Sequence, residues 1–184
     1  MLESIALNTV TIKDGSFNFK DESKGSSLNV SNVGLTIKGQ GIFGPYDVDG
    51  RLDYKGQPVN VQITAGRLDK ISESVALQVN ATIPAYETMI SYKGVIAYVD
   101  KGVELQGETG LKTTQAGQLY TYVTGAQNTG LEGYKDKNIS AKGLLTFGAG
   151  RMSFQNAALN IAGMEFNGGV SVVFPDEDEG LRTD

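Results

Sequence analysis

The feature that most constrains the fold of this chain is a strict alternation of apolar and polar residues with a period of two. It is clearest from Gly44 to Gly66, in the stretch GPYDVDGRLDYKGQPVNVQITAG. In its first half, one parity is apolar except for Gly50, and the other parity holds three aspartates and an arginine. Such alternation is typical of a strand with one buried and one solvated face. The glycine-containing break at Lys55–Gly56 predicts a hairpin between the two halves.

Similar alternating runs recur along the chain, about ten in all, and many exceed the ~5–6 residues of an average strand. The apolar parity changes near Ser31–Asn32 and again near Gln155–Asn156. Because a one-residue slip moves side chains to the other face, a β-bulge is predicted at both places. The pair Asp14–Gly15 predicts a turn that ends the first strand. Together these runs predict an all-β protein with an elongated, curved antiparallel sheet, either an open half-barrel or a groove.

Glycine stands in the apolar row of several runs, near the middle of the strand. A glycine inside a strand marks a bend, a bulge or the close approach of another group. Its similar placement in successive runs predicts a sheet that curves in the same way along its length. Small residues on the apolar row would leave a furrow between their larger neighbours: Gly50, Gly94, Gly107, Ala141, Gly143 and Gly168.

The alternation stops between residues 113 and 133. Four apolar residues there have the spacing of one short amphipathic helix, although a covering loop is the alternative: Leu119, Tyr122, Val123 and Ala126. A chain of 184 residues is long enough for one domain with a sizeable core, so residues 1–174 are predicted to form a single β domain. The acidic segment 175–184 is predicted to be a disordered tail.

Composition and charge exclude several classes of function. The net charge is −5 and the charges are interleaved, whereas nucleic-acid binding requires a basic patch. The chain has no His and no Cys, which removes the commonest general base, the thiol nucleophile and most zinc or copper ligands. No window approaches ~18 consecutive apolar residues, and the first residues lack the features of a signal peptide. We therefore expect no nucleic-acid partner and no span of the bilayer.

Carboxylates are the remaining candidates for catalysis or metal binding. Asp47, Asp49 and Asp53 share one strand face, and residues 176–179 form an acidic run. Glycoside hydrolysis needs two carboxylates across a cleft, and calcium needs six to eight converging oxygens. Alternate side chains of a strand instead stay parallel, ~6.8 Å apart. We therefore expect no enzyme activity, no metal site and no cofactor.

Three stretches share a pattern of strands, turns and glycines. Residues 5–19, IALNTVTIKDGSFNF, read as a strand, a glycine-containing turn and an aromatic strand. Residues 28–61 include the spacing G-x-L-x-Y-x-G-x-P-V, from Gly50 to Val59, and residues 139–174 contain paired strands that end on an apolar-x-Gly step. Over most of its length the chain thereby resembles the AsmA-like family of bacterial envelope proteins, relatives of TamB and the bridge-like lipid-transfer proteins.

This resemblance implies a β-sheet rolled into an open groove whose apolar inner face accommodates phospholipid acyl chains, while the headgroups stay in water. It also implies a role in phospholipid transport and outer-membrane biogenesis. Family members are typically held in the inner membrane by an N-terminal helix and project into the periplasm. Because this sequence has no such helix, the resemblance implies an internal or C-terminal segment of a longer, membrane-anchored protein.

The residues predicted to line the groove come from both halves of the chain: Val48, Leu52, Val61, Ile63, Leu77, Val79, Ile90, Ile96, Leu105, Leu145 and Phe166. The alternative is that the two halves of the sheet close on each other as an ordinary core. The chain would then be a structural or adhesive scaffold without a ligand. A continuous apolar face cannot stay wet, so it must be covered by a protein layer or by a ligand. The two hypotheses differ in what covers that face.

Overall fold

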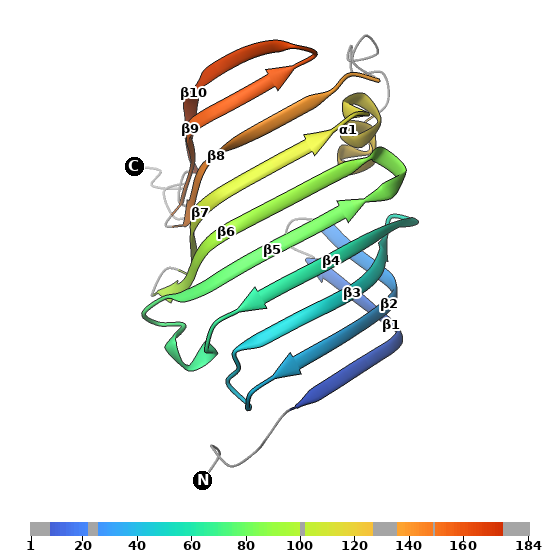
Figure 1. The fold of residues 1–184 in the computed structure, drawn as a ribbon, viewed down its shortest axis with the longest axis vertical. Coiled ribbons are helices and arrows are strands. Elements are labelled where there is room, and N and C mark those ends of the chain that lie inside the picture. Colours follow the sequence, from blue (N-terminus) through green and yellow to red (C-terminus); the bar gives the residue numbers. More distant parts are fainter. Residues whose placement is uncertain (1–7, 22–25, 100–101, 127–135, 149, 175–184) are drawn as a thin grey trace, which may run out of the picture.

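The computed structural model describes residues 8–21, 26–99, 102–126, 136–148 and 150–174, which form one ten-stranded antiparallel sheet (Figure 1). The strands follow one another across the sheet in the order of the sequence. Their bounds are β1 Thr9–Asp21, β2 Ser26–Gly39, β3 Tyr46–Tyr54, β4 Gln57–Ala65, β5 Val75–Ile83, β6 Thr88–Val99, β7 Gly102–Thr113, β8 Ile139–Gly148, β9 Arg151–Ile161 and β10 Met164–Val173.

The sheet remains open, because β1 pairs only with β2 and β10 pairs only with β9 in the described part of the chain. One α-helix, α1 (Ala116–Thr124), and two short 3-10 helices, η1 (Leu68–Lys70) and η2 (Pro84–Tyr86), accompany it. The prediction of an all-β protein with a curved, open antiparallel sheet and at most one short helix is confirmed. The predicted tail at 175–184 lies outside the described residues.

Tight turns explain why the sheet is a simple meander. Lys55 and Gly56 connect β3 to β4, and Ala162 and Gly163 connect β9 to β10. All four have positive φ angles, of 46°, 75°, 52° and 90°. Two consecutive residues of this kind match the right-handed twist of the strands that they join, as in type I′ hairpins. The hairpin predicted at Lys55–Gly56 is therefore confirmed.

Three bulges bend the outer strands. Asp14 in β1, Asn32 in β2 and Asn156 in β9 have φ angles of 52°, 49° and 50°. The pairing register shifts next to each of them. Asp and Asn adopt this left-handed conformation more readily than other residues that carry a side chain. The bulges predicted near Ser31–Asn32 and Gln155–Asn156 are confirmed.

The turn predicted at Asp14–Gly15 is wrong. The pair lies inside β1, where Gly15 stands opposite Val33 and the strand continues to Asp21. The extra residue in β1 is compensated by the extra residue at Asn32 in β2, so that Phe17 again faces Val30. A bulge and a turn both use Asp-Gly to reach a positive φ, and here the hairpin pairing holds the chain extended.

The bulges give the sheet its curvature, because a bulge bends its strand and increases the local twist. In Figure 1, β1 and β2 turn sharply and their far halves pass behind the middle of the sheet. The strands β8, β9 and β10 bend at the opposite edge. The result is a curved ribbon of strands, not a flat sheet.

Very little of the apolar surface is buried. In the described residues the buried hydrophobic side chains are Val75 and Ile83, whereas large hydrophobic side chains are exposed along the sheet, such as Phe17, Met89 and Phe166. Extensive contacts between strands join only neighbours in the sequence. The two halves of the described sheet therefore do not pack on each other, and no second layer of strands closes a core.

Candidate functional site

One face of the sheet, called here the apolar face, carries every residue that the sequence predicts to line a groove. Val48, Ile63 and Val79 stand opposite one another in β3, β4 and β5. Ile96 in β6 and Leu105 in β7 stand opposite each other farther along the sheet. The pairings place the remaining predicted residues on the same face: Leu52, Val61, Leu77, Ile90, Leu145 and Phe166. The structure thus brings the whole predicted set together on one surface.

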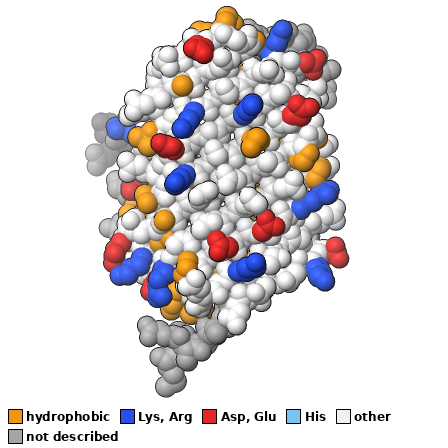
Figure 2. Space-filling model, in the orientation of Figure 1, with side chains coloured by type: hydrophobic (Ala, Val, Ile, Leu, Met, Phe, Trp, Pro, Cys, Tyr) orange, Lys and Arg blue, Asp and Glu red, His pale blue; other side chains and the backbone are white. Residues whose placement is uncertain are grey.

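The apolar face carries no charge over its regular part. In β3–β8, whose residues are all described, every Asp, Glu, Lys and Arg within a strand occupies the opposite parity, called here the polar face. Figure 2 shows the polar face, on which positive and negative side chains are scattered among uncharged ones, a few of them hydrophobic. The two faces of the sheet therefore differ sharply in the kind of molecule that they can contact.

The three strand carboxylates considered for catalysis or calcium binding lie along the polar face, and the acidic run 176–179 lies outside the described residues. Asp47 accepts a hydrogen bond from Thr64 Oγ1 (3.1 Å) and Asp49 accepts one from Gln62 Nε2 (3.1 Å). Asp53 accepts one from the side-chain amide of Asn32 at 2.7 Å. Each carboxylate thus has its own cross-strand partner, as in the side-chain pairs that stabilise sheets. Among the described residues, no three carboxylates converge on a point that could hold a metal ion.

At two glycines of the apolar face, Gly94 and Gly143, a neighbouring aromatic side chain occupies part of the space that the predicted furrow would need. Gly94 and Gly107 face each other in β6 and β7, and a Cβ on Gly94 would lie 2.8 Å from the hydroxyl of Tyr92. A Cβ on Gly143 would lie 2.6 Å from the ring of Phe154. The furrow prediction is therefore wrong at these glycines. At Gly143 the absence of a side chain leaves room for the ring of Phe154.

The hydroxyl groups of this face are directed to the backbone. Tyr92 Oη donates a hydrogen bond to the carbonyl of Val95 at 2.8 Å, and Thr109 Oγ1 donates one to the carbonyl of Ser91 at 2.9 Å. Burial raises the pKa of Tyr92, which keeps the phenol neutral well beyond neutral pH. What this part of the face presents to a ligand is hydrocarbon and aromatic carbon.

Helix α1 lies beside the end of β7, where the central strands of the sheet terminate (Figure 1). A buried polar cluster fixes the start of this helix. Thr88 and Thr113 are each only 1% exposed, and their hydroxyl oxygens lie 3.0 Å apart. Thr113 Oγ1 also donates to the carbonyl of Tyr86 (2.9 Å) and accepts from the backbone N–H of Gln115 (3.1 Å). These bonds join β6, β7, η2 and the residue before α1 at a single point.

The other end of α1 is held by the β3–β4 hairpin. Tyr122 packs against the rings of Tyr54 and Tyr86, with centroid distances of 5.8 and 4.9 Å, and its hydroxyl donates to the carbonyl of Tyr54 at 2.5 Å. Lys55 Nζ donates to the carbonyls of Tyr122 (3.2 Å) and Val123 (2.7 Å), where a cation favours a helix C-terminus. Burial, then the neighbouring Tyr86, raises the pKa of Tyr122. Both ends of the helix are thus attached to the ends of the central strands.

Several residues of the apolar face were missed by sequence reasoning. Phe17 and Phe19 in β1 and Leu28 in β2 are 55%, 53% and 38% exposed and share the face with Val30 and Tyr54. Val30 stands opposite Tyr54, which ties the far halves of β1 and β2 to the apolar row of β3. The change of apolar parity in the sequence could have identified them. A bulge adds one residue to a strand, so the apolar face changes from even to odd positions, or the reverse, on the far side of the bulge.

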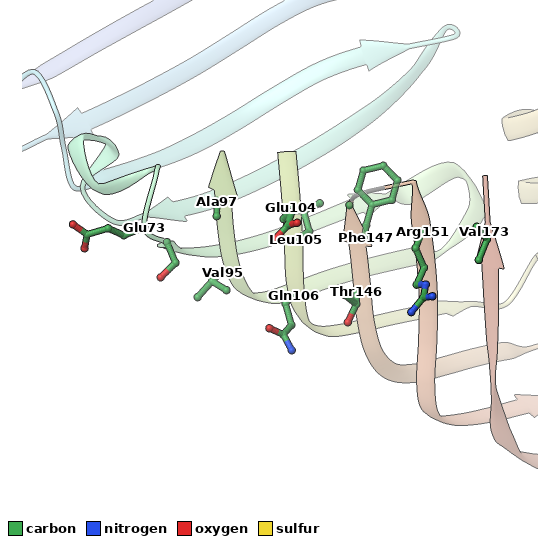
Figure 3. Close-up of a pocket in the computed structure, with 12 residues that line it drawn as sticks. Glu73, Val95, Ala97, Glu104, Leu105, Gln106, Thr146, Phe147, Arg151 and Val173 are labelled. Atoms are coloured by element: carbon green, nitrogen blue, oxygen red, sulfur yellow. The ribbon is translucent and has the colours of Figure 1, made fainter. Parts of the chain in front are cut away.

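A separate depression of about 610 Å³ lies mainly on the polar face (Figure 3). It lies over the end of β6 and the start of β7, at the strand ends away from α1. Its lining mixes polar and apolar side chains from five strands, among them Val95, Gln106, Thr146 and Arg151. In the described residues no ion pair joins Arg151 to Glu73 or Glu104, although all three border the depression. Its polar groups do not form a converging set, and its lining is mixed in polarity, whereas the apolar face is uniform.

Comparisons of the chain with family models, with curated proteins and with solved structures give no significant match. Within the described part of the chain, no helix has the length and hydropathy needed to cross a membrane. The apolar face is therefore the feature of the described structure that points most directly to a function.

Proposed function

We propose that this chain is a non-enzymatic, lipid-binding and lipid-conducting β-groove segment of a bacterial envelope protein. Its ligands are phospholipid acyl chains, and it acts in the periplasm in phospholipid transport and outer-membrane biogenesis, anchored to the inner membrane through another part of a longer protein. The observation that carries this proposal is the apolar face, which is free of charge over β3–β8 and has no covering protein layer in the described residues. The resemblance to AsmA-like proteins supports a location in the bacterial envelope and lipid as the ligand.

The energetics of apolar surface favour a hydrocarbon ligand. Exposed apolar area is unfavourable by roughly 25 cal/mol per Å², and contiguous patches beyond a few hundred Å² mark interaction sites. A face that runs across all ten strands far exceeds the isolated exposed side chains of an ordinary surface. Acyl chains are flexible enough to follow a curved surface and have no hydrogen-bonding groups that the face would leave unpaired. Phospholipid headgroups would stay in water at the edges of the sheet.

The absence of enzyme activity belongs to the same proposal. Asp47, Asp49 and Asp53 lie on the polar face, on the side away from the apolar surface, and each has its own amide or hydroxyl partner. General acid–base chemistry on a lipid would need such groups beside the bound ligand. The arrangement supports a protein that binds and guides its ligand without altering it.

Replacing Val79 with Glu tests this proposal. Val79 lies in the middle of β5 on the apolar face, between Ile63 and Tyr92. A carboxylate there would have to be buried beneath acyl chains without a partner, which costs several kcal/mol. We expect the phospholipid that co-purifies with the chain from a Gram-negative host to fall by roughly tenfold or more. Lipid extraction followed by mass spectrometry measures the amount.

The matched control is Gln78→Glu, which places the same charge one residue away on the polar face, opposite Lys93. It should leave the lipid content unchanged, and both variants should keep the β-sheet circular dichroism spectrum. Loss of that spectrum in Val79→Glu alone would mean that Val79 belongs to a protein core. Wild-type chain that carries no lipid would likewise contradict the proposal and leave a structural scaffold.

A further inference from the structure

The two open edges of the sheet are built differently. Edge strand β1 carries a bulge at Asp14 next to Lys13, and both bulges and charged residues are devices that prevent an edge from pairing with another strand. Edge strand β10 carries no bulge of its own, because the extra residue of the β9–β10 bulge, Asn156, lies in β9, and Glu165 is its one charged residue between Met164 and Val173. All ten residues of β10 are exposed. Of the two edge strands in the described part of the chain, β10 is therefore the less protected against pairing with another strand.

The free backbone groups of β10 can be assigned from its pairing with β9. Phe174 N–H donates to the carbonyl of Gly150, and Met164 follows the two-residue turn that begins after Ile161. In an antiparallel pair the backbone groups of alternate residues point to the same neighbour. The even-numbered residues of β10 therefore bond to β9, and the N–H and C=O groups of the odd-numbered residues, such as Ser171, point to the open edge.

The sequence of β10 is complementary to itself. When two copies are paired antiparallel about Gly168, Met164 stands opposite Val172 and Phe166 opposite Val170, which are favourable aromatic and β-branched pairs. On the other face Glu165 stands opposite Ser171, so no like charges meet. Because residues directly opposite in an antiparallel pair share a face, the apolar faces of the two copies would lie on the same side.

We propose that β10 is a dimerisation edge at which a second copy of this chain adds antiparallel about Gly168, so that the partner copy extends the apolar face across a continuous twenty-stranded sheet. The ten strands of each copy give this number. The contact is isologous and closes after two copies, since the protected β1 edges stay outside it. The inference concerns the backbone edge and goes beyond the proposed function, because it holds whether or not the apolar face takes lipid.

Sedimentation velocity of the purified chain, without added lipid, tests the dimer. We expect a species of twice the chain mass that dissociates on dilution. Ser171→Pro should give a monomer, because proline removes an N–H that faces the open edge and leaves the β9–β10 ladder intact. Ser171→Glu should raise the dimer dissociation constant roughly tenfold, because it sets a second carboxylate opposite Glu165 of each partner.

A charge exchange makes the test specific for the second copy. The double variant Ser171→Glu, Glu165→Lys should restore the dimer, because each new carboxylate then faces a lysine of the other copy. Within one chain these positions are six residues apart along an extended strand, too far to contact each other. A monomeric wild type would overturn the proposal. So would an open series of larger species, or a dimer that none of the β10 variants alters, which would indicate pairing through the apolar faces instead.

Discussion

At the Gly94–Gly107 pair the backbones of β6 and β7 approach too closely for a side chain on either residue. A Cβ on Gly107 would lie 2.5 Å from Gly94 Cα and 2.6 Å from the carbonyl oxygen of Lys93. Both atoms belong to the backbone, so no rotamer change relieves the contact. Glycine is therefore required here by the close approach of the strands, and the hydroxyl of Tyr92 also lies 2.8 Å from the Cβ position of Gly94.

Gly107→Ala tests this account of the glycines. The added methyl group would push β6 and β7 apart, and overpacking of this kind costs about 1–3 kcal/mol of unfolding free energy. Gly34→Ala is the matched control, because a Cβ at Gly34 meets only the carbonyl oxygen of Arg51, at 3.9 Å, and its φ is not positive. Urea unfolding followed by circular dichroism measures both. Equal effects of the two substitutions would show that the pair at Gly94 and Gly107 is not under steric constraint.

At the scale of single elements, the start of α1 depends on the buried Thr88–Thr113 pair. Thr113→Val keeps the shape of the side chain but leaves the N–H of Gln115 without its acceptor and removes the hydroxyl bonds to Thr88 and to the carbonyl of Tyr86, while Thr88 Oγ1 keeps the carbonyl of Tyr86 (3.1 Å) as its acceptor. Leaving buried polar groups unpaired costs about 1–3 kcal/mol, so we expect a loss of that size in the unfolding free energy. Urea denaturation of the single variant measures it.

Two controls identify the cause of that loss. Thr146→Val removes an exposed hydroxyl on the polar face and should change stability by less than about 0.5 kcal/mol. The double variant Thr88→Val, Thr113→Val removes both partners, so its loss should be smaller than the sum of the two single losses. Additive losses would show that the two hydroxyl groups act independently.

The strands were largely predictable, because the alternation and parity of apolar residues can be read from neighbouring positions in the sequence. The slips at Asn32 and Asn156 were visible as changes in the apolar parity, and the pairing places bulges there. Asp14 was misassigned because Asp-Gly serves turns and bulges alike, and only the pairing of Gly15 with Val33 distinguishes them. The docking of α1 could not be predicted, since Tyr54, Tyr86 and Tyr122 are brought together by the meander and not by sequence spacing.

At the scale of the whole molecule, the apolar face was predictable but its exposure was not. Alternation assigns Val79 and Leu105 to a face, and the observed pairings agree. Whether that face closes on itself depends on curvature that accumulates over ten strands, and single-residue bulges such as those in β1, β2 and β9 contribute to it. The sequence therefore left a closed core and an open groove as alternatives. The described structure has an open sheet with little buried apolar surface.

Site-specific photocrosslinking tests the central claim most directly. The photoreactive residue p-benzoylphenylalanine replaces Val79 in one variant and the adjacent Gln78 in another, and each variant is irradiated with phosphatidylethanolamine and phosphatidylglycerol vesicles. Mass spectrometry then counts the lipid adducts on the protein. The account predicts phospholipid adducts at position 79 on the apolar face and few or none at position 78 on the polar face. Equal yields at the two positions, or crosslinks from position 79 only to the protein itself, would contradict it.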